Sequence, residues 1–377
     1  MPEIYSSIAC NLDSDIISAI IPLLGESRVQ AIEWSFDALY GVEEVPAWFT
    51  NLLIAYSDEG RLIGHGVFFS LFSGRWSYDQ QNWLNELKRL SSLFKFDHIS
   101  EHYGFMTGKS FHDGAPLSIP YSKTALNIGR DRLARIYDAC RCPVGLENLA
   151  FSYSLDEVKN HGEFLEQLIE PINGFMILDL HNLYCQMHNF SIGFDEIIDL
   201  YPLNRVREIH ISGGSWEDSS FTKNRIRRDT HDNAVPAEVF ELLKSTITLC
   251  PNLKFVVLEQ MGTGLKTERS RALFYNDFLT MESIVLKSNS LSSNEVLNKF
   301  LPVQSIKLSH IIQDELLFRQ QEQLSSILET AASYYDAVTQ LKNSSLANTE
   351  WKIESWQPYM LETAISIAQK WKVKEVL

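Results

Sequence analysis

Short apolar segments alternate with longer amphipathic ones through the first three quarters of the chain. Eight segments rich in β-branched and aromatic residues predict strands at 4–10, 30–37, 62–70, 96–104, 143–151, 175–184, 206–214 and 254–260. Between many of them, apolar residues recur at helical spacing, as in 14–24, 79–93, 125–140, 155–169 and 236–249. This alternation is typical of repeated strand–helix–strand units, which build parallel sheets.

Eight strands with intervening helices over about 260 residues match the size of a TIM (β/α)8 barrel. The competing fold is an open, doubly wound sheet. Such sheets often carry a glycine-rich phosphate turn after the first strand, and this sequence has none there. We therefore predict an α/β fold in which a TIM barrel occupies residues 1–287.

The last hundred residues have little strand character. Residues 293–341 carry apolar residues at helical spacing, and 356–371 form a further helix candidate. Serine- and asparagine-rich segments at 288–294 and 342–350 are typical of linkers. We predict a helical extension over residues 288–377. It could cover a face of the barrel, recruit a partner or bridge a homodimer, and the sequence does not choose among these roles.

Charge and composition narrow the classes of partner. Hydrophobic residues make up 45% of the 377 residues, enough for a large core. The net charge of −15 disfavours non-specific binding to nucleic acid phosphates or anionic membranes. We identify no signal peptide, and no apolar run has the roughly 18 residues of a membrane span. Five scattered cysteines fit reduced thiols, so we expect a cytoplasmic protein.

Residue types that bind metals recur at the ends of the predicted strands, where TIM barrels place their active sites. The third to eighth strands, with their following loops, carry His65; Glu101 and His102; Glu147; Asp179, His181 and Asn182; His210, Asp229 and His231; and Glu259. Each residue alone is weak evidence, because a single histidine in an apolar strand is usually a hydrogen-bonded core residue. Their shared placement is the stronger signal.

Six strands that deliver imidazoles or carboxylates to one rim would bury several charges together. That burial is costly unless cations compensate it. Mixed imidazole and carboxylate ligands favour iron, zinc or manganese over calcium or magnesium. One ion would leave several of these groups unused, so two or three ions are the expected number.

The hydrophilic stretch RRDTHD, residues 227–232, belongs to this pattern. Asp229 and His231 are two residues apart, so an extended loop can direct both side chains toward one pair of ions. The neighbouring arginines Arg225, Arg227 and Arg228 cannot bind a metal. They could hold a substrate carboxylate through paired hydrogen bonds, or they could neutralise the acidic ligands or lie in solvent. The sequence leaves these readings open.

Together, the motifs GHG, SEH, LEN, LDLHN, EIHISGG and DTHD and the glutamate of the last strand resemble the multinuclear non-heme iron-dependent oxidases. This family was long catalogued as a domain of unknown function and includes the methanobactin biosynthesis enzyme. The resemblance covers about residues 30–265. It implies a TIM barrel with two or three irons in mixed Fe(II) and Fe(III) states, and O2 as co-substrate. Members modify ribosomally made precursor peptides, often at cysteine, and commonly act with a small partner protein that holds the peptide leader.

Matched motif by motif, the resemblance implies the metal ligands His65, His102, Glu147, Asp179, Asn182, His210, Asp229, His231 and Glu259, with His210, Asp229 and His231 closest to catalysis. Two departures stand out. Many relatives have Asn-Asn where this chain has His181-Asn182, so which of the two faces the metals stays open. After the last strand, relatives often read Glu-Arg-Asp where this chain reads LEQMG. Both departures, and the helical extension beyond the common core, indicate a divergent branch whose substrate and product cannot be taken over from the best-known members.

Two other classes of function remain. The same order of ligands occurs in xylose-isomerase-like barrels, which include zinc endonucleases and sugar isomerases, where metals activate water or substrate. Asn182 in place of a histidine and the strong negative charge argue against a nuclease. The third class is a barrel without metals that serves as a binding scaffold, and the intact set of ligand residues disfavours it.

Overall fold

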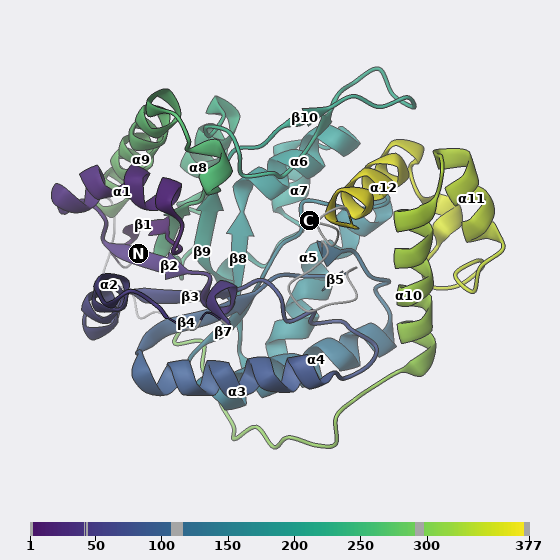
Figure 1. Ribbon diagram of the computed structural model, residues 1–377, viewed down its shortest axis with the longest axis horizontal. Coiled ribbons are helices and arrows are strands. Elements are labelled where there is room, and N and C mark those ends of the chain that lie inside the picture. Colours follow the sequence, from purple (N-terminus) through teal and green to yellow (C-terminus); the bar gives the residue numbers. More distant parts are fainter. Residues whose placement is uncertain (1–2, 41, 43, 107–115, 291–297, 373–377) are drawn as a thin grey trace.

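A closed barrel of eight parallel strands forms the centre of the computed structural model, which describes residues 3–40, 42, 44–106, 116–290 and 298–372 (Figure 1). The strands are β1 (Tyr5–Ala9), β2 (Ala31–Trp34), β3 (Leu62–Gly66), β4 (Phe96–Glu101), β7 (Val144–Glu147), β8 (Phe175–Asp179), β9 (Val206–Ile211) and β12 (Phe255–Leu258). They pair in the order β1-β12-β9-β8-β7-β4-β3-β2, and β2 closes the ring on β1. All eight predicted strands form, which confirms the TIM barrel.

Helices follow the strands and cover the outside of the barrel. They are α1 (Ser14–Gly25), α2 (Ala47–Asp58), α3 (Tyr78–Leu93), α4 (Lys123–Cys140), α5 (Leu155–Ile169), α6 (Leu180–Phe190), α7 (Phe194–Ile198), α8 (Ala237–Thr246) and α9 (Glu268–Asn289). Polar residues fix where these helices begin. Ser77 and Gln80 form a capping box at the start of α3, for example, and Ser154 caps α5. Within the described residues, no helix has the length and apolar character that crossing a membrane requires.

Two short antiparallel hairpins decorate the loops after β4 and β9. One pairs β5 (Phe105–Met106) with β6 (Pro116–Leu117), and the other pairs β10 (Trp216–Glu217) with β11 (Ile226–Arg227). Both loops leave the carboxyl ends of their strands. The second hairpin contains Arg225 and Arg227, and Arg228 directly follows it.

The C-terminal extension is helical only in part. Its helices are α10 (Glu315–Thr330), α11 (Tyr334–Lys342) and α12 (Pro358–Lys372), and they pack together beside the barrel (Figure 1). The helical spacing predicted over 293–341 is wrong for residues 298–314, which follow an irregular path to α10. Barrel side chains bind backbone carbonyls of this segment, as Arg132 does at Ile312 and Arg135 at Ser309. The predicted boundary at 287/288 lies inside the last turn of α9, and residues 291–294 of the predicted linker are outside the described residues.

The extension docks on loops at the carboxyl ends of the strands. The backbone of Gly74, after β3, exchanges hydrogen bonds with Asp314 and Gln321. A Cβ atom on Gly74 would lie 2.5 Å from the backbone nitrogen of Phe318, so this close approach requires glycine. On the other side of the extension, Trp356 stacks on Tyr153, after β7, with ring centroids 3.7 Å apart and planes 9° apart.

We expect Trp356→Ala to loosen the extension. The indole is buried and its Nε1 donates to the carbonyl of Trp351 at 3.0 Å, so truncation removes both packing and a hydrogen bond. The free energy of unfolding should fall by about 3 kcal/mol, the range for large-to-small changes in a core. Urea denaturation measures the change. Leu316→Ala on the exposed side of α10 is the control, and it should change stability by no more than about 0.5 kcal/mol.

Candidate metal centre

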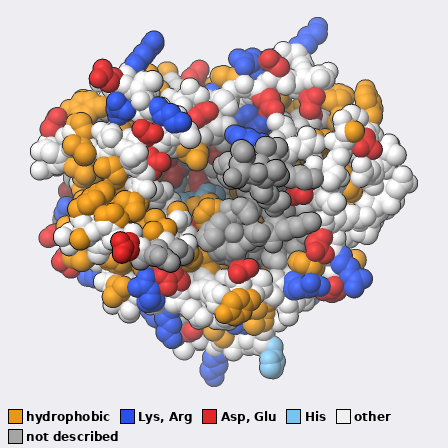
Figure 2. Space-filling model, in the orientation of Figure 1, with side chains coloured by type: hydrophobic (Ala, Val, Ile, Leu, Met, Phe, Trp, Pro, Cys, Tyr) orange, Lys and Arg blue, Asp and Glu red, His pale blue; other side chains and the backbone are white. Residues whose placement is uncertain are grey.

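The carboxyl ends of the barrel strands bring most of the predicted ligand residues together. His65, Glu147, Asp179 and His210 lie in the last residues of β3, β7, β8 and β9, whereas His102 and Glu259 directly follow β4 and β12. Figure 2 shows a recess near the middle of the visible face, with acidic and histidine side chains inside it. Glu101 precedes His102 by one residue, and because side chains alternate along a strand it joins none of the ligand groups described below.

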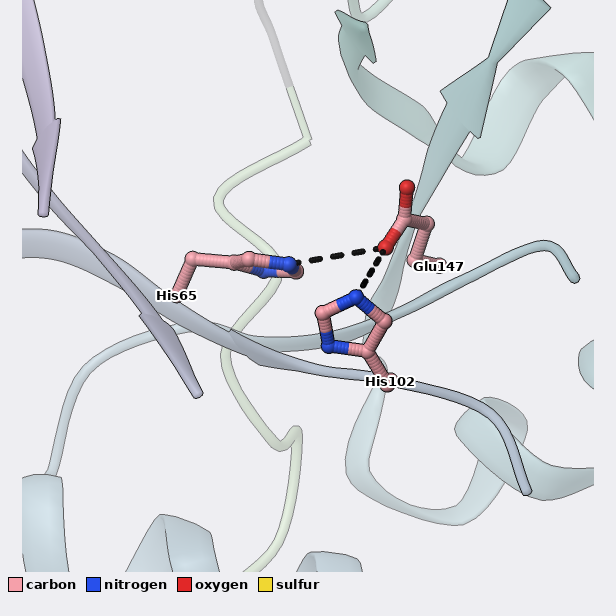
Figure 3. Close-up of side chains that lie close together, drawn as sticks. All are labelled: His65, His102 and Glu147. Atoms are coloured by element: carbon pink, nitrogen blue, oxygen red, sulfur yellow. Dashed lines mark ion pairs between the residues drawn. The ribbon is translucent and has the colours of Figure 1, made fainter. Parts of the chain in front are cut away.

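The first group consists of His65, His102 and Glu147 (Figure 3). Nε2 of His65 lies 3.4 Å from Oε2 of Glu147, and Nε2 of His102 lies 3.3 Å from the same oxygen. The other nitrogens of the two rings are held by the protein: Nδ1 of His65 lies 2.8 Å from Oγ of Ser100, and Nδ1 of His102 lies 3.0 Å from the carbonyl oxygen of Gly66. Both imidazoles therefore present Nε2 to the same point.

The second group consists of Glu147, Asp179, His210 and Glu259. Nδ1 of His210 lies 3.5 Å from Oε1 of Glu147 and 3.3 Å from Oε2 of Glu259. Ligands at about 2.1 Å from a tetrahedral ion are about 3.4 Å apart, so the spacing suits a single ion. Glu147 thus directs one oxygen to each group, and its carboxylate lies between two adjacent candidate metal positions.

Several atoms of the kinds that bind metals are buried at this site and have no hydrogen-bond partner. Among the described residues, the buried side-chain atoms that lack a hydrogen-bond partner include Oε2 of Glu147, Oδ2 of Asp179, Nδ1 of His210 and Oδ1 of Asn182. Buried polar atoms are normally hydrogen-bonded, and an orphan needs an explanation such as a bound ion. Three of these atoms, on Glu147, Asp179 and His210, belong to the two ligand groups and fit a site for metal ions.

Asp179 has a second role, which fixes the orientation of its carboxylate. It is the last residue of β8 and the N-cap of α6, where its Oδ1 accepts a hydrogen bond from the backbone N–H of Asn182 at 2.6 Å. The cap aligns the carboxylate and leaves Oδ2 for the second group. One residue therefore begins a helix and supplies a candidate ligand.

Asp229 and His231 lie beside the second group. Nε2 of His231 lies 2.9 Å from Oδ1 of Asp229, and its Nδ1 lies 3.5 Å from Oε2 of Glu259. His231 has a backbone φ of 51°, a left-handed conformation that is uncommon outside glycine, and its carbonyl accepts from the N–H of Met261 at 2.7 Å. Neither residue completes a separate group of three ligands among the described residues.

His181 and Asn182 face different partners. Nδ1 of His181 lies 2.9 Å from Oδ1 of Asp229, and its Nε2 accepts from Nε of Arg227 at 3.0 Å, so both ring nitrogens are engaged. Asn182 donates through Nδ2 to the carbonyl of Asn148, which leaves Oδ1 unpaired and buried. The geometry thus leaves a free ligand atom on Asn182 and none on His181.

The three arginines each have a partner within the chain. Arg227 is buried beneath the rings of Trp216 and Tyr184 and holds His181. Arg228 pairs with Glu217, and the exposed Arg225 pairs with Asp218 at 3.0 Å. No substrate is needed to account for the position of Arg227.

Two buried carboxylates were missed by the sequence reasoning. Glu33 in β2 and Glu208 in β9 form a third group with His210, below the other two. Nε2 of His210 lies 3.1 Å from Oε2 of Glu33 and 3.4 Å from Oε1 of Glu208. The signal was present in VREIH, because a glutamate two residues before a buried strand histidine shares its face.

The surrounding charges favour the protonated forms of His65 and His210 when no metal is bound. Burial lowers the pKa of His65, but Glu33 and Glu147 outweigh it and raise the pKa to about 10. Burial likewise opposes protonation of His210, yet Glu259 and Glu33 raise its pKa well above the usual value. Burial alone would raise the pKa of Glu147, but His102, His210 and His65 hold it well below the ordinary range. Protons therefore occupy sites that a cation would take.

We expect metal binding to release protons. An imidazole must be deprotonated to bind a metal, and His65 holds its proton until the pH approaches about 10. Apparent affinity should therefore rise between about pH 6 and pH 9, by up to about tenfold per pH unit for each proton displaced. Calorimetric titration with a divalent metal in buffers of different ionisation enthalpy measures the protons released. An affinity that stays constant over this range would contradict the expectation.

Comparison with known proteins places this site in a family. The model of the family described as RiPP precursor modification enzyme MbnB/TglH/ChrH matches residues 44–262, which include all nine predicted ligands. The chain belongs to this family. The members' substrates are precursors of ribosomally made, modified peptides, in keeping with that description. Glu33 and the C-terminal extension lie outside the matched residues.

Curated relatives agree with this membership. A UPF0276 protein of Acaryochloris marina is 28% identical over 216 residues, covering 55% of this chain and 69% of the relative. A UPF0276 protein of Chromobacterium violaceum is 29% identical over 184 residues, covering 48% and 64%. The matches thus span about two thirds of the relatives' length.

Solved structures that resemble this chain include the IOLI protein with a binding zinc atom. Its TM-score is 0.48 at 12% identity, and the match covers 74% of this chain and 98% of that one. A xylose isomerase domain protein from Planctomyces limnophilus has a TM-score of 0.49 at 13% identity, covering 77% and 100%.

Proposed function

We propose that the protein is a multinuclear non-heme iron oxidase that uses O2 to modify a ribosomally synthesised precursor peptide. The family membership supports the peptide substrate and the enzyme class. The observation that carries the metal centre is the position of Glu147, whose two oxygens face two different sets of imidazole and carboxylate ligands. Glu147 would therefore offer one oxygen to each of two ions.

The donor set suits iron. The two groups together offer three imidazoles and three carboxylates and no thiolate, a mixture that binds iron, zinc or manganese. Bound iron would supply the one-electron chemistry and the activation of O2 that amino-acid side chains lack. The protein's part is to hold the ligands, to keep bulk water out of the buried recess and to position the peptide.

A third ion has a place beside the second group. We assign to it Asn182, Asp229 and His231, because Oδ1 of Asn182 is unpaired and Asp229 and His231 lie within 2.9 Å of each other. His181 and Arg227 then act as positioning residues for Asp229, since both nitrogens of His181 are engaged. His210, Asp229 and His231 would lie nearest to the reacting substrate.

Arg225 and Arg228 are the arginines that could receive a substrate carboxylate. Arg225 is exposed, and its ion pair with Asp218 is a surface pair that contributes little, so a carboxylate of the peptide could replace it. Arg228 lies closer to the site, next to Asp229. Arg225 lies in the loop of the β10–β11 hairpin and Arg228 directly follows β11, and we place the approaching peptide along this segment.

Metal content and oxygen uptake test the proposal. The full chain is purified without oxygen from iron-supplemented cells and analysed for metals, then mixed with a precursor peptide encoded beside its gene. We expect at least two irons per chain and oxygen uptake that depends on the peptide. Stoichiometric zinc with little iron would favour a hydrolase or a sugar isomerase of the xylose-isomerase-like kind, and a chain without bound metal would favour a binding scaffold. A small leader-binding partner protein is added in a parallel assay, because the peptide alone is not the substrate if a partner must present it.

A further inference from the structure

Beneath the metal centre, the inside of the barrel holds a column of charged side chains. From top to bottom it runs from His210 through Glu33 and Glu208 to His98 in β4, then to Asp97. Apart from Asp97, these residues are almost fully inaccessible, at 1% exposure or less. Phe175 and Phe255 pack against the ring of His98, so this polar column passes through apolar surroundings.

Hydrogen bonds define the state of His98. Its Nε2 lies 2.6 Å from Oε2 of Glu208, and its Nδ1 lies 2.9 Å from Oδ1 of Asp97. Nε of Arg207 also approaches Nδ1, at 3.3 Å, but the shorter contact is with the carboxylate. Because both ring nitrogens face carboxylate oxygens, both carry hydrogen and His98 is an imidazolium. Burial opposes this charge, yet Glu208 and Asp97 raise the pKa of His98 above its ordinary value.

Below His210, the column is balanced in charge without any bound ion. Glu33, Glu208 and Asp97 contribute three negative charges, and His98, Arg207 and Lys254 contribute three positive ones. Arg207 donates to Asp97 at 2.6 Å, and Lys254 contacts the other oxygen of the same carboxylate. A buried column of ions is stable only when its charges are paired. The charges of Glu33 and Glu208 are therefore matched within the column, and Oε1 of each has no hydrogen-bond partner.

We propose that Glu33 and Glu208 are the positioning residues of the metal centre, acting together on the Nε2–H of His210. Glu33 accepts this hydrogen at 3.1 Å, and Glu208 lies 3.4 Å from the same nitrogen and is itself held by His98. With Nε2 committed to carboxylates below, Nδ1 is the nitrogen that faces Glu147 and Glu259 above. The carboxylate pair also pushes electron density into the ring, which makes His210 a stronger ligand.

The inference rests on the proposed metal centre but not on its chemistry, so binding of cobalt alone tests it. Metal-free full-length chain is titrated with Co(II), and the visible spectrum reports the affinity and the ligand environment of each ion. Glu33→Gln keeps the shape and an acceptor oxygen but removes the charge. We expect it to weaken one of the binding steps by about 10- to 100-fold and to alter the spectrum of that ion. The step that involves His65 and His102 should weaken less, because that ligand group does not include His210.

Two further variants separate positioning from folding. Glu208→Gln should weaken the same step as Glu33→Gln, which gives a second reading if one variant does not fold. Asp131→Asn disrupts a buried ion pair with Arg132 and Arg135 in the outer helix α4, and should lower thermal stability without changing cobalt affinity. Wild-type affinity and spectrum in folded Glu33→Gln and Glu208→Gln would refute the positioning role alone. If the wild-type chain binds no cobalt, the metal centre fails and this inference fails with it.

Discussion

Glu147→Gln should empty both metal groups at once. The substitution removes the carboxylate that the two groups share and leaves an amide NH2 facing imidazole nitrogens. We expect metal content to fall from at least two ions per chain to less than one. Activity on a precursor peptide should fall by at least about a thousandfold, which corresponds to about 4 kcal/mol of lost transition-state stabilisation. Elemental analysis and a peptide assay by mass spectrometry measure the two effects.

A matched change shows whether the loss is specific. Glu157, in α5, is partly buried, but its carboxylate accepts from the backbone N–H of Tyr153 and belongs to none of the ligand groups of the described residues. Burial raises its pKa to about 7, so the neutral amide in Glu157→Gln resembles its protonated form. This variant should keep its metals. Equal metal loss in both variants would mean that Glu147→Gln acts through folding, and full metal content in Glu147→Gln would rule out the bridging role.

His102→Ala should remove one ion and leave the other. His102 belongs to the first group only, and its side chain is 28% exposed, so truncation opens little space in the core. We expect the metal content to fall by one ion per chain, while the ligands of the second group stay intact. Peptide modification should stop, since the proposed chemistry needs adjacent ions, with a loss of at least about a hundredfold. Metal analysis on the same preparation that is assayed links the two results.

The control for this variant is His310→Ala in the segment before α10. His310 is exposed and contributes to no ligand group among the described residues, so metal content and activity should match the wild type. An active His102→Ala chain with one ion would show that a single metal suffices. Loss of every ion would instead mean that the two groups bind cooperatively.

The ends of the strands could be predicted from the sequence because short runs of β-branched and aromatic residues, and their order along the chain, are local signals. Once eight strands were recognised, the barrel required His65, Glu147 and Asp179 to meet at one rim, and the structure brings them together there. The shared role of Glu147 could not be read in this way. It depends on which oxygen faces which imidazole, and that follows from the closed ring and its register.

The column inside the barrel was harder to predict. Glu33, Glu208 and His98 lie on three strands that are far apart in sequence, and a lone charged residue in a strand resembles a surface position. The helix predicted for residues 298–314 was wrong because tertiary contacts there override a local pattern. The apolar spacing of these residues is helical, but Arg132 and Arg135 bind backbone carbonyls of this segment, and only tertiary structure reveals that competition.

Asp179 links the metal centre to the secondary structure of a helix. The carboxylate that offers Oδ2 to the second group caps α6 through Oδ1, so the two interactions constrain one side chain. Filling the centre will therefore slow hydrogen exchange at the first amides of α6, including that of Asn182. Because linkage is reciprocal, fraying of this helix end will also lower the affinity of the site for metal. The first turn of α6 is thus a reporter of occupancy that needs neither substrate nor catalysis.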